Sequence, residues 1–260
     1  MRENNIKTIW AKGGTVINGW LAIPSSISAE LMALQDWDSI CIDLQHGAIG
    51  YETAITMLQA ISTTNKTPIV RVPANEGGII GKVLDAGAYG VICPMVNTAA
   101  EAAAFVRSCR YHPLGQRSVG PLRASLYAGA DYVKNANTTV LTMPMIESAE
   151  AVRNLDAILA TPSLDSVYVG PSDLSVSMNE SAGFDPMFPG VLKAIELIAE
   201  RANKAGVMPG IHVGTVAYGK RCRDMGYRLI TYLSDFRILQ QAASRGISAM
   251  RAFEPAPGIA

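Results

Sequence analysis

Three polar residues follow directly after a run of β-forming residues in the segment D-S-I-C-I-D-L-Q-H-G, residues 38–47. Burying an acid, an amide and an imidazole costs free energy unless each group finds a partner, and a turn needs only the glycine. The spacing allows Asp43 to orient the imidazole of His46, which leaves the second ring nitrogen free as a base. The alternative is that Asp43, Gln45 and His46 form a purely structural group of hydrogen-bonded side chains.

Two further acids stand at the ends of predicted strands, Glu147 in M-P-M-I-E-S and Asp173 in V-G-P-S-D-L-S. Neighbouring strands of a sheet lie about 4.8 Å apart, so carboxylates at the ends of adjacent strands can share one cation. Oxygen ligands without cysteine suit Mg²⁺ or Mn²⁺. The alternative is that each acid caps the helix that follows it.

Arg71 in I-V-R-V-P and His212 in P-G-I-H-V-G also end predicted strands. A buried arginine needs an anionic partner. Arg71 therefore either forms a structural bridge to Asp43 or Glu147, or it binds an enolate or keto-acid oxygen through its planar guanidinium. His212 is either a satisfied histidine at the rim of the fold or a donor to the hydroxyl or carbonyl oxygen of an incoming aldehyde.

The elements that must position these side chains alternate regularly. Short β-branched runs predict strands near 15–23, 38–43, 67–72, 89–94, 139–146, 165–170, 207–212 and 227–232. Longer runs rich in Ala, Leu and Glu predict helices near 27–35, 51–62, 77–87, 98–110, 148–159, 187–205, 215–225 and 235–248.

Eight such units in 260 residues favour a single (β/α)₈ TIM barrel over residues 1–260. The same alternation permits a doubly wound open sheet, but no G-x-G-x-x-G opens the first unit. In a barrel, functional groups cluster at the carboxyl ends of the strands. The candidate residues all follow predicted strands, so we expect them to meet at one mouth.

The composition excludes several classes of protein. The formal net charge is +0, which gives no sign of nucleic-acid or anionic-membrane binding. No segment is long and apolar enough to span a bilayer, and the segment after Lys12 fits a first strand better than a signal peptide. The four cysteines show no C-x-x-C pairing, which favours reduced thiols and a cytoplasmic location. From about residue 254 we expect a loose C-terminal extension.

The lysines argue against imine chemistry, which needs a lysine at a strand end. They fall instead in the N-terminal segment, before the third strand, or on helices and connections: Lys7, Lys12, Lys66, Lys82, Lys134, Lys193, Lys204 and Lys220. Activation of a carbon acid would then depend on the metal, without an organic cofactor.

Several motifs taken together resemble the HpcH/HpaI family of class II pyruvate-dependent aldolases. The resemblance covers the chain from about Gly19 to about Met250. Its specific pieces, in family order, are I-D-L-Q-H, I-V-R-V-P, K-V-L-D-A-G-A-Y-G-V-I-C-P-M-V, Y-H-P-L-G-Q-R, M-I-E-S and V-G-P-S-D-L-S.

The resemblance implies a divalent metal (Mg²⁺ or Mn²⁺, with Co²⁺ possible) held by Glu147 and Asp173. It further implies a His46–Asp43 dyad, Arg71 on the enolate oxygen, and backbone N–H groups around Ser172 and Asp173 that bind the keto-acid carboxylate. Asp85 matches an aspartate that reaches the site of a neighbouring subunit. Family members are typically homohexamers, built as trimers of dimers.

The chain departs from the family pattern at three places. Relatives often read G-E-H where this chain has Leu44-Gln45-His46, and they often have Gln two residues before the metal-binding Glu, where this chain has Met145. At His212 relatives more often carry an aliphatic residue. The first two changes bear on metal affinity and substrate range, and Gln45 and His212 are candidate substrate-binding residues.

The predicted function is reversible cleavage of a 4-hydroxy-2-oxo acid into pyruvate, or hydroxypyruvate, and an aldehyde through a metal-stabilised enolate. His46, or a water that it controls, acts as the base. Oxaloacetate decarboxylation through the same enolate is an alternative, and a non-catalytic barrel that binds keto acids is another. The gathering of charged groups in one cleft favours chemistry.

Overall fold

Eight parallel strands close into one barrel in the computed structural model, which describes residues 1–252. Each strand pairs in parallel with the next along the chain, and β8 pairs with β1. The prediction of a (β/α)₈ barrel is therefore confirmed. The strands are β1 (Val16–Leu21), β2 (Ser39–Asp43), β3 (Thr67–Arg71), β4 (Gly90–Cys93), β5 (Leu141–Ile146), β6 (Ser166–Val169), β7 (Met208–Val213) and β8 (Leu229–Tyr232).

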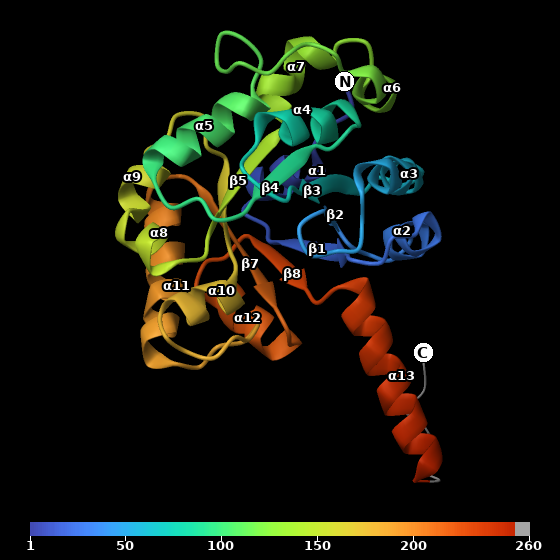
Figure 1. Ribbon diagram of the computed structural model, residues 1–260, viewed down its shortest axis with the longest axis vertical. Helices are drawn as coiled ribbons and strands as arrows, with labels where there is room; N and C mark the ends of the chain where they lie inside the picture. The colour runs from blue at the N-terminus through green and yellow to red at the C-terminus, as the bar shows by residue number, and fades with distance from the viewer. Residues whose placement is uncertain (253–260) are drawn as a thin grey trace.

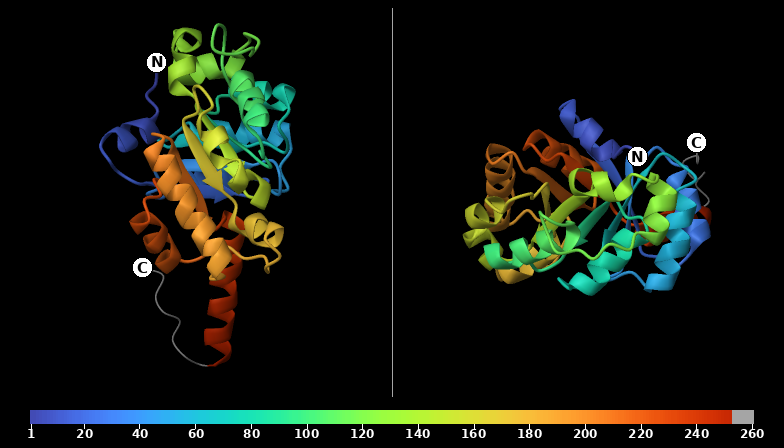
Figure 2. Two further views of the ribbon diagram at one scale, coloured as in Figure 1. Left: turned by 90° about the vertical axis from the view of Figure 1, so that its left-hand side faces the viewer. Right: turned by 90° about the horizontal axis from the view of Figure 1, so that it is seen from above.

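Helices surround the barrel (Figure 1, Figure 2). Those that follow the successive strands are α2 (Ser26–Ala33), α3 (Tyr51–Ile61), α4 (Gly77–Asp85), α5 (Ala99–Cys109), α8 (Ala149–Arg153), α9 (Leu155–Leu159), α11 (Pro189–Lys204), α12 (Val216–Asp224) and α13 (Asp235–Arg251). Four more were not predicted: α1 (Asn5–Ala11), α6 (Leu122–Ala128), α7 (Tyr132–Thr139) and α10 (Pro171–Ser177).

The predicted strands lie within two residues of the observed ones, because each is a short apolar run whose side chains are almost entirely buried. The helix predicted over 148–159 is instead two short helices, α8 and α9, which meet at Asn154. The Asn154 side chain donates to the carbonyl of Asn97, a hydrogen bond outside the helix that accompanies the break. The extension predicted from about residue 254 lies outside the described residues.

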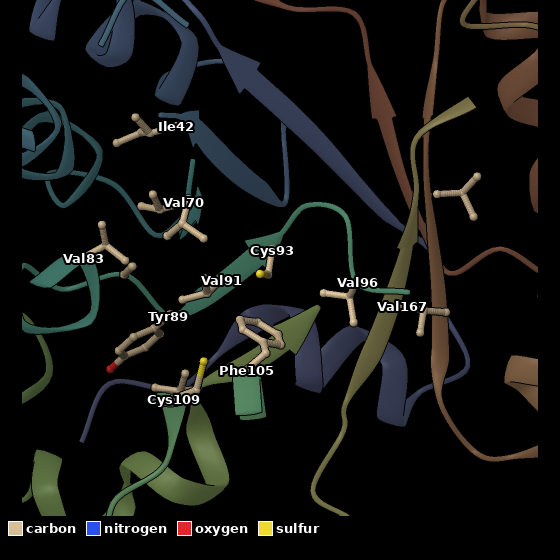
Figure 3. Packing of buried hydrophobic residues seen from close by; sticks show 14 of the residues in the cluster. Ile42, Val70, Val83, Tyr89, Val91, Cys93, Val96, Phe105, Cys109 and Val167 are labelled. Carbon is tan, nitrogen blue, oxygen red and sulfur yellow. The ribbon is translucent and has the colours of Figure 1, made fainter. Parts of the chain in front are cut away.

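Two hydrophobic clusters stabilise the barrel. One fills the space between the strands and the surrounding helices, and part of it, including Val70, Tyr89 and Phe105, is shown in Figure 3. The other occupies the inside of the barrel, where Ile6 and Trp10 of α1 pack against inward-facing strand residues. The N-terminal helix α1 therefore contributes to the interior core, away from the carboxyl ends of the strands.

All four cysteines, Cys41, Cys93, Cys109 and Cys222, are free and buried. Burial raises the pKa of the Cys109 and Cys222 thiols to about 12. It also raises the pKa of Cys41 and Cys93 above the ordinary value. These thiols are core residues, as the sequence indicated.

Helix α13 differs from the other helices, because it points away from the barrel over most of its length (Figure 1). Of its 17 residues only Asp235, at its first position, is buried. Asp235 fixes the start of the helix by accepting hydrogen bonds from the backbone N–H of Ala22 and the hydroxyl of Ser28, both at 2.8 Å.

Within residues 1–252, none of the helices combines the length and the apolar character that crossing a membrane requires.

Candidate active site

A cavity of 380 Å³ opens at the carboxyl ends of the strands. Six of the residues that the sequence singled out or placed near the site line it: Asp43, His46, Arg71, Ser172, Asp173 and His212. The expected convergence of these residues on one mouth is therefore observed. The remaining wall is largely apolar and aromatic, formed by Trp20, Ala22, Met145, Tyr168, Gly170, Pro171, Phe184, Ser234, Phe236 and Arg237.

The ion pair between Asp43 and Arg71 lies on one side of the cavity. The two residues are direct partners in the pairing of β2 with β3. Arg71 Nε donates to Asp43 Oδ1 at 2.8 Å and Arg71 Nη2 donates to Oδ2 at 2.6 Å, which is the two-bond geometry of a strong ion pair. Although burial opposes it, the Arg71 guanidinium lowers the pKa of Asp43 below its ordinary value.

Asp43 also receives three further hydrogen bonds. Trp20 Nε1 donates to Oδ2 at 3.2 Å, and the backbone N–H groups of Gln45 and His46 donate to Oδ1 at 3.0 and 3.2 Å. Among the described residues, both carboxylate oxygens of Asp43 accept from donors other than the His46 imidazole, so the His46–Asp43 dyad stays a prediction. Asp43 instead fixes the backbone of the turn that carries the exposed His46 side chain into the cavity.

The turn after β2 requires glycine at position 47. A Cβ atom added to Gly47 would lie 2.3 Å from the carbonyl oxygen of Asp43, closer than any real contact. The chain can therefore fold back over Asp43 only with glycine there.

Glu147 is 97% shielded from solvent, with a relative exposure of 3%, directly after β5. Its Oε1 accepts a hydrogen bond from the backbone N–H of Met95 at 2.8 Å. Burial raises the pKa of Glu147 to about 7, opposed by the Met95 N–H and assisted by the nearby charge of Asp173. A buried carboxylate beside a second carboxylate is the electrostatic condition that a bound cation relieves.

Gly170 makes room for this carboxylate. A Cβ atom at position 170 would lie 2.3 Å from Glu147 Oε2 and 2.9 Å from the end of the Met145 side chain. Gly170 precedes α10, a helix that the sequence did not reveal and whose first turn carries Asp173. The missing side chain of Gly170 therefore lets Glu147 lie close against the start of α10, below the cavity.

The two acids do not cap helices, which was the alternative interpretation. Ser148, not Glu147, caps α8 by accepting the N–H of Ala151. Asp173 is the third residue of α10, and Gly170 precedes that helix without a side-chain cap. Apart from the hydrogen bond that Glu147 Oε1 accepts from Met95, neither carboxylate accepts a hydrogen bond in the described part of the chain. Oxygen donors of this kind suit Mg²⁺ or Mn²⁺.

Across residues 1–252, no group of three or more His, Cys, Asp or Glu side chains is arranged to hold a metal ion. The carboxylate pair fits a cation that keeps water or substrate oxygens as its other ligands, as Mg²⁺ commonly does.

His212, on β7, lines the cavity between two aromatic rings. The imidazole stacks on Phe184 with ring centres 4.9 Å apart and meets the Trp20 ring edge-on at 5.0 Å. Burial, with a further contribution from the Arg71 charge, lowers the pKa of His212 to about 3. The imidazole is therefore neutral at physiological pH. No sequence motif predicted a role for Phe184, which lies in the connection between α10 and α11.

Besides the buried Glu147, two candidate residues do not line the cavity. Gln45 lies in the turn after β2, and its Oε1 is buried without a hydrogen-bond partner among the described residues. Asp85 is the last residue of α4, which begins beyond the carboxyl end of β3, so Asp85 lies towards the other end of the barrel. It forms an ion pair with the buried Arg117 at 2.7 Å. No lysine lines the cavity within the part of the chain that the structure describes.

A parallel barrel with a buried glutamate, an exposed aspartate near it, an arginine and an imidazole at its carboxyl mouth has the layout of a barrel enzyme. Comparison with known proteins gives its class. The family model described as HpcH/HpaI aldolase/citrate lyase matches residues 18–239. The chain is 38% identical to a hydroxypyruvate/pyruvate aldolase of Rhizorhabdus wittichii over 249 residues, which cover 96% of this chain and 99% of the relative.

Two other relatives indicate the same family. A 4-hydroxy-2-oxo-heptane-1,7-dioate aldolase of Escherichia coli is 36% identical over 244 residues, covering 93% of this chain and 92% of the relative. The crystal structure of an HpcH/HpaI aldolase/citrate lyase family protein from Burkholderia cenocepacia J2315 superposes with a TM-score of 0.89 at 32% identity, covering 95% of this chain and 99% of that one. The chain therefore belongs to the HpcH/HpaI aldolase/citrate lyase family. It is an aldolase, a carbon–carbon lyase.

We expect the pH dependence of stability to reveal the buried Glu147 carboxyl. Its pKa in the folded, metal-free protein is about 7, against 4.5 for an exposed glutamate. Between these values the folded state holds the proton more tightly than the unfolded state, so the free energy of unfolding falls as the pH rises. The fall should be about 3 kcal/mol larger in the wild type than in Glu147→Gln.

Urea titrations of both metal-free proteins from pH 4.5 to pH 8 measure this difference. The variant Glu200→Gln, which changes an exposed glutamate on α11, is the control and should follow the wild type. Parallel curves for the wild type and Glu147→Gln would show that Glu147 ionises normally.

Proposed function

We propose that this aldolase reversibly cleaves a 4-hydroxy-2-oxo acid into pyruvate or hydroxypyruvate and an aldehyde, with a divalent metal ion as cofactor. The observation that carries the proposal is the buried Glu147 carboxylate beside Asp173, in reach of the cavity that Arg71 and His46 line. The names of the two aldolase relatives, which include pyruvate, hydroxypyruvate and a 4-hydroxy-2-oxo acid, support the substrate class.

In this proposal Glu147 and Asp173 hold Mg²⁺ or Mn²⁺, and Co²⁺ would fit the same oxygen donors. When bound, such an ion supplies a Lewis acid that withdraws electron density from the 2-oxo acid. Ser172 lines the cavity at the start of α10, where the first N–H groups of the helix lack partners within it. The backbone N–H groups of residues 172 and 173 then bind the carboxylate of the 2-oxo acid.

Arg71 stabilises the enolate oxygen in this mechanism. Its Nε and Nη2 donate to Asp43, so its Nη1 remains for a substrate oxygen among the interactions of the described residues. The Arg71 guanidinium also lies over the Trp20 ring, 4.8 Å from its centre. Both contacts hold the group in place before substrate arrives, which is the arrangement that favours stabilisation of developing charge.

His46 is the proposed base, acting directly or through a water molecule. Its side chain lines the cavity, and the hydrogen bond from its backbone N–H to Asp43 fixes the position of the turn. The base removes a proton from the carbon next to the keto group, and the resulting carbanion attacks the aldehyde in the synthetic direction.

We further propose a homo-oligomer, with the hexamer of the family as the expected form and Asp85 contributing to the site of a neighbouring subunit. Helix α13 supports association, because several of its apolar residues lie on one stripe that faces solvent in the single chain. Four of them are more than half exposed: Phe236, Leu239, Ile247 and Met250. A stripe of this kind marks a protein contact.

The barrel offers a surface for this stripe from a second copy. A helix would ordinarily cover the flank between α12 and α2, over β8 and β1. Because α13 points away (Figure 1), that flank carries an apolar groove of 230 Å³, lined in part by Ile17, Trp37, Val216 and Ile230. The groove and the stripe are both apolar, so we propose that α13 of one copy packs on the flank of another.

The free, buried cysteines support a cytoplasmic location.

The proposed activity should appear when purified protein is incubated with pyruvate, Mg²⁺ or Mn²⁺ and a panel of aldehydes. Chelation should remove the activity and the metal should restore it. Glu147→Gln and Asp173→Asn should each abolish activity, and calorimetry should show that they no longer bind Mn²⁺ while circular dichroism shows an intact fold. Asp156→Asn, on the exposed face of α9, is the matched control. Full activity after exhaustive chelation would contradict the metal requirement.

Arg71→Lys should lower kcat by at least about a hundredfold, the scale of losing one donor to a developing oxyanion. Lysine keeps the charge beside Asp43 but lacks the planar fork that reaches Asp43 and a substrate oxygen together. Thermal unfolding of the variant separates this effect from loss of the ion pair. Arg201→Lys, in the exposed pair with Asp156, serves as the control. A rate close to that of the wild type would make Arg71 purely structural.

Charges placed on the α13 stripe should weaken the oligomer. We expect Leu239→Glu with Ile247→Glu to reduce the molar mass measured by light scattering, because two buried carboxylates would oppose the contact. Gln241→Glu with Ser248→Glu adds the same charge to the opposite face of the helix and should leave the mass unchanged. A monomeric wild type, or equal masses for all three proteins, would contradict the proposed packing.

A further inference from the structure

The connection between β4 and α5 lies against Glu147. The backbone N–H of Met95 donates to Glu147 Oε1 at 2.8 Å. Met95 has a φ of 54°, in the left-handed region that residues with side chains seldom adopt. Its side chain has a relative exposure of 52%, so packing of the side chain does not explain this backbone conformation. The conformation instead directs the N–H group at the carboxylate.

The residues on both sides of Met95 restrict the connection. Pro94 comes directly before it, and the proline ring fixes its own φ. Val96 comes directly after it and is completely buried in the core between the strands and the helices (Figure 3). A left-handed residue with a side chain persists only where its surroundings impose that conformation, and such residues often occur at functional sites.

Asn97 ties this connection to the chain beyond Glu147. Its Nδ2 donates to the carbonyl of Met95 at 3.3 Å, and its Oδ1 accepts from the hydroxyl of Ser148, the residue after Glu147. Its backbone carbonyl accepts from Asn154 Nδ2 at 2.8 Å. Ser148 and Asn154 flank α8 as its two caps. Asn97 therefore joins the peptide that follows Met95 to both ends of the helix that follows Glu147.

Helix α10 is joined to the same set of contacts. Ser177 lies one turn after Asp173, and its hydroxyl accepts the backbone N–H of Ala149 at 2.9 Å. Ala149 begins α8, next to Ser148. Hydrogen bonds therefore connect the segments after β4, β5 and β6, which surround the two acids.

The two carboxylate oxygens of Glu147 have different surroundings. Oε1 accepts the Met95 N–H. Oε2 faces Gly170, because a Cβ atom at that position would clash with it. Gly170 directly precedes α10, whose first turn carries Asp173. The protein thus occupies one oxygen and directs the other towards the helix that carries the second acid.

We propose that Asn97 is a positioning residue for metal binding, which holds the Met95 N–H on Oε1 of Glu147 so that Oε2 is presented to a cation. This inference rests on the proposed metal cofactor. A metal ligand binds best when its neighbours fix its orientation, and loss of one such neighbour typically weakens metal binding by about tenfold to a hundredfold.

Asn97→Ala removes both side-chain hydrogen bonds of Asn97 and should raise the Kd for Mn²⁺, measured by calorimetry, by about tenfold to a hundredfold. Thr98→Ala is the matched control. It removes the side-chain cap of α5, where Thr98 Oγ1 accepts the N–H of Glu101, and leaves the contacts of the Asn97 side chain in place. The control should lower the melting temperature without changing the Kd. Wild-type protein that binds Mn²⁺ no more tightly than Asn97→Ala would overturn the inference and leave the proposed cofactor intact.

Two substitutions of Met95 test the backbone conformation itself. Glycine adopts a φ of this sign readily, whereas a β-branched valine is strongly disfavoured there. Met95→Val should therefore turn the N–H away from Glu147 and weaken Mn²⁺ binding as Asn97→Ala does. Met95→Gly should bind Mn²⁺ about tenfold or more tightly than Met95→Val. Equal affinities of these two variants would contradict the role of the Met95 backbone.

A measurement without metal keeps the inference testable if the variants fold poorly. Hydrogen exchange of the Met95 amide can be followed by NMR in metal-free protein labelled with ¹⁵N-methionine. The amide should exchange slowly in the wild type, because it is hydrogen-bonded, and faster in Asn97→Ala. A freely exchanging Met95 amide in the wild type would overturn the inference alone. A protected amide in a wild type that binds neither Mn²⁺ nor Mg²⁺ would contradict the proposed cofactor, and the inference with it.

Discussion

The ion pair between Asp43 and Arg71 is the interaction on which the rest of the site depends. It joins adjacent strands at their carboxyl ends, in exact register, and is mostly buried. A buried pair is favourable only when its remaining hydrogen-bonding capacity is filled. The Trp20 indole and the turn that carries His46 supply those bonds. The same Trp20 ring then borders His212, so one ion pair fixes the positions of an arginine, an aromatic wall and a histidine.

Two buried acids at the carboxyl ends of the strands are in opposite electrostatic conditions. Asp43 has a guanidinium partner, which lowers its pKa. Glu147 has only a backbone N–H and a neighbouring acid, and its pKa rises to about 7. The protein itself neutralises the charge of Asp43, whereas a ligand must neutralise the charge of Glu147. Glycine at position 170 is required for this environment of Glu147, because a Cβ atom there would displace the Glu147 carboxylate.

The sequence predicted the barrel and the gathering of candidate residues at its mouth, because strand order in a barrel follows chain order and each strand is an apolar run. An ion pair between Asp43 and Arg71 was also one of the two interpretations of Arg71, the other being that it binds a substrate oxygen. The direction of the His46 side chain was not predictable, since spacing along a turn does not say which donors will reach a carboxylate first. Phe184 was missed for a similar reason, because it lies in an irregular connection and reaches His212 only through the closure of the barrel. Helix α10 was hidden by its short length, although Pro171 at its start is a typical signal.

The chemical character of the cavity wall has a consequence for the durability of the protein. Aldehydes modify proteins by adding to unprotonated amines and thiolates. No lysine lines the cavity in the part of the chain that the structure describes. The four thiols are buried, and their raised pKa values keep them in the unreactive protonated form. A molecule that handles reactive carbonyl compounds at every turnover therefore presents them with an arginine, carboxylates, aromatic rings and a neutral imidazole, none of which forms a stable adduct with an aldehyde under mild conditions.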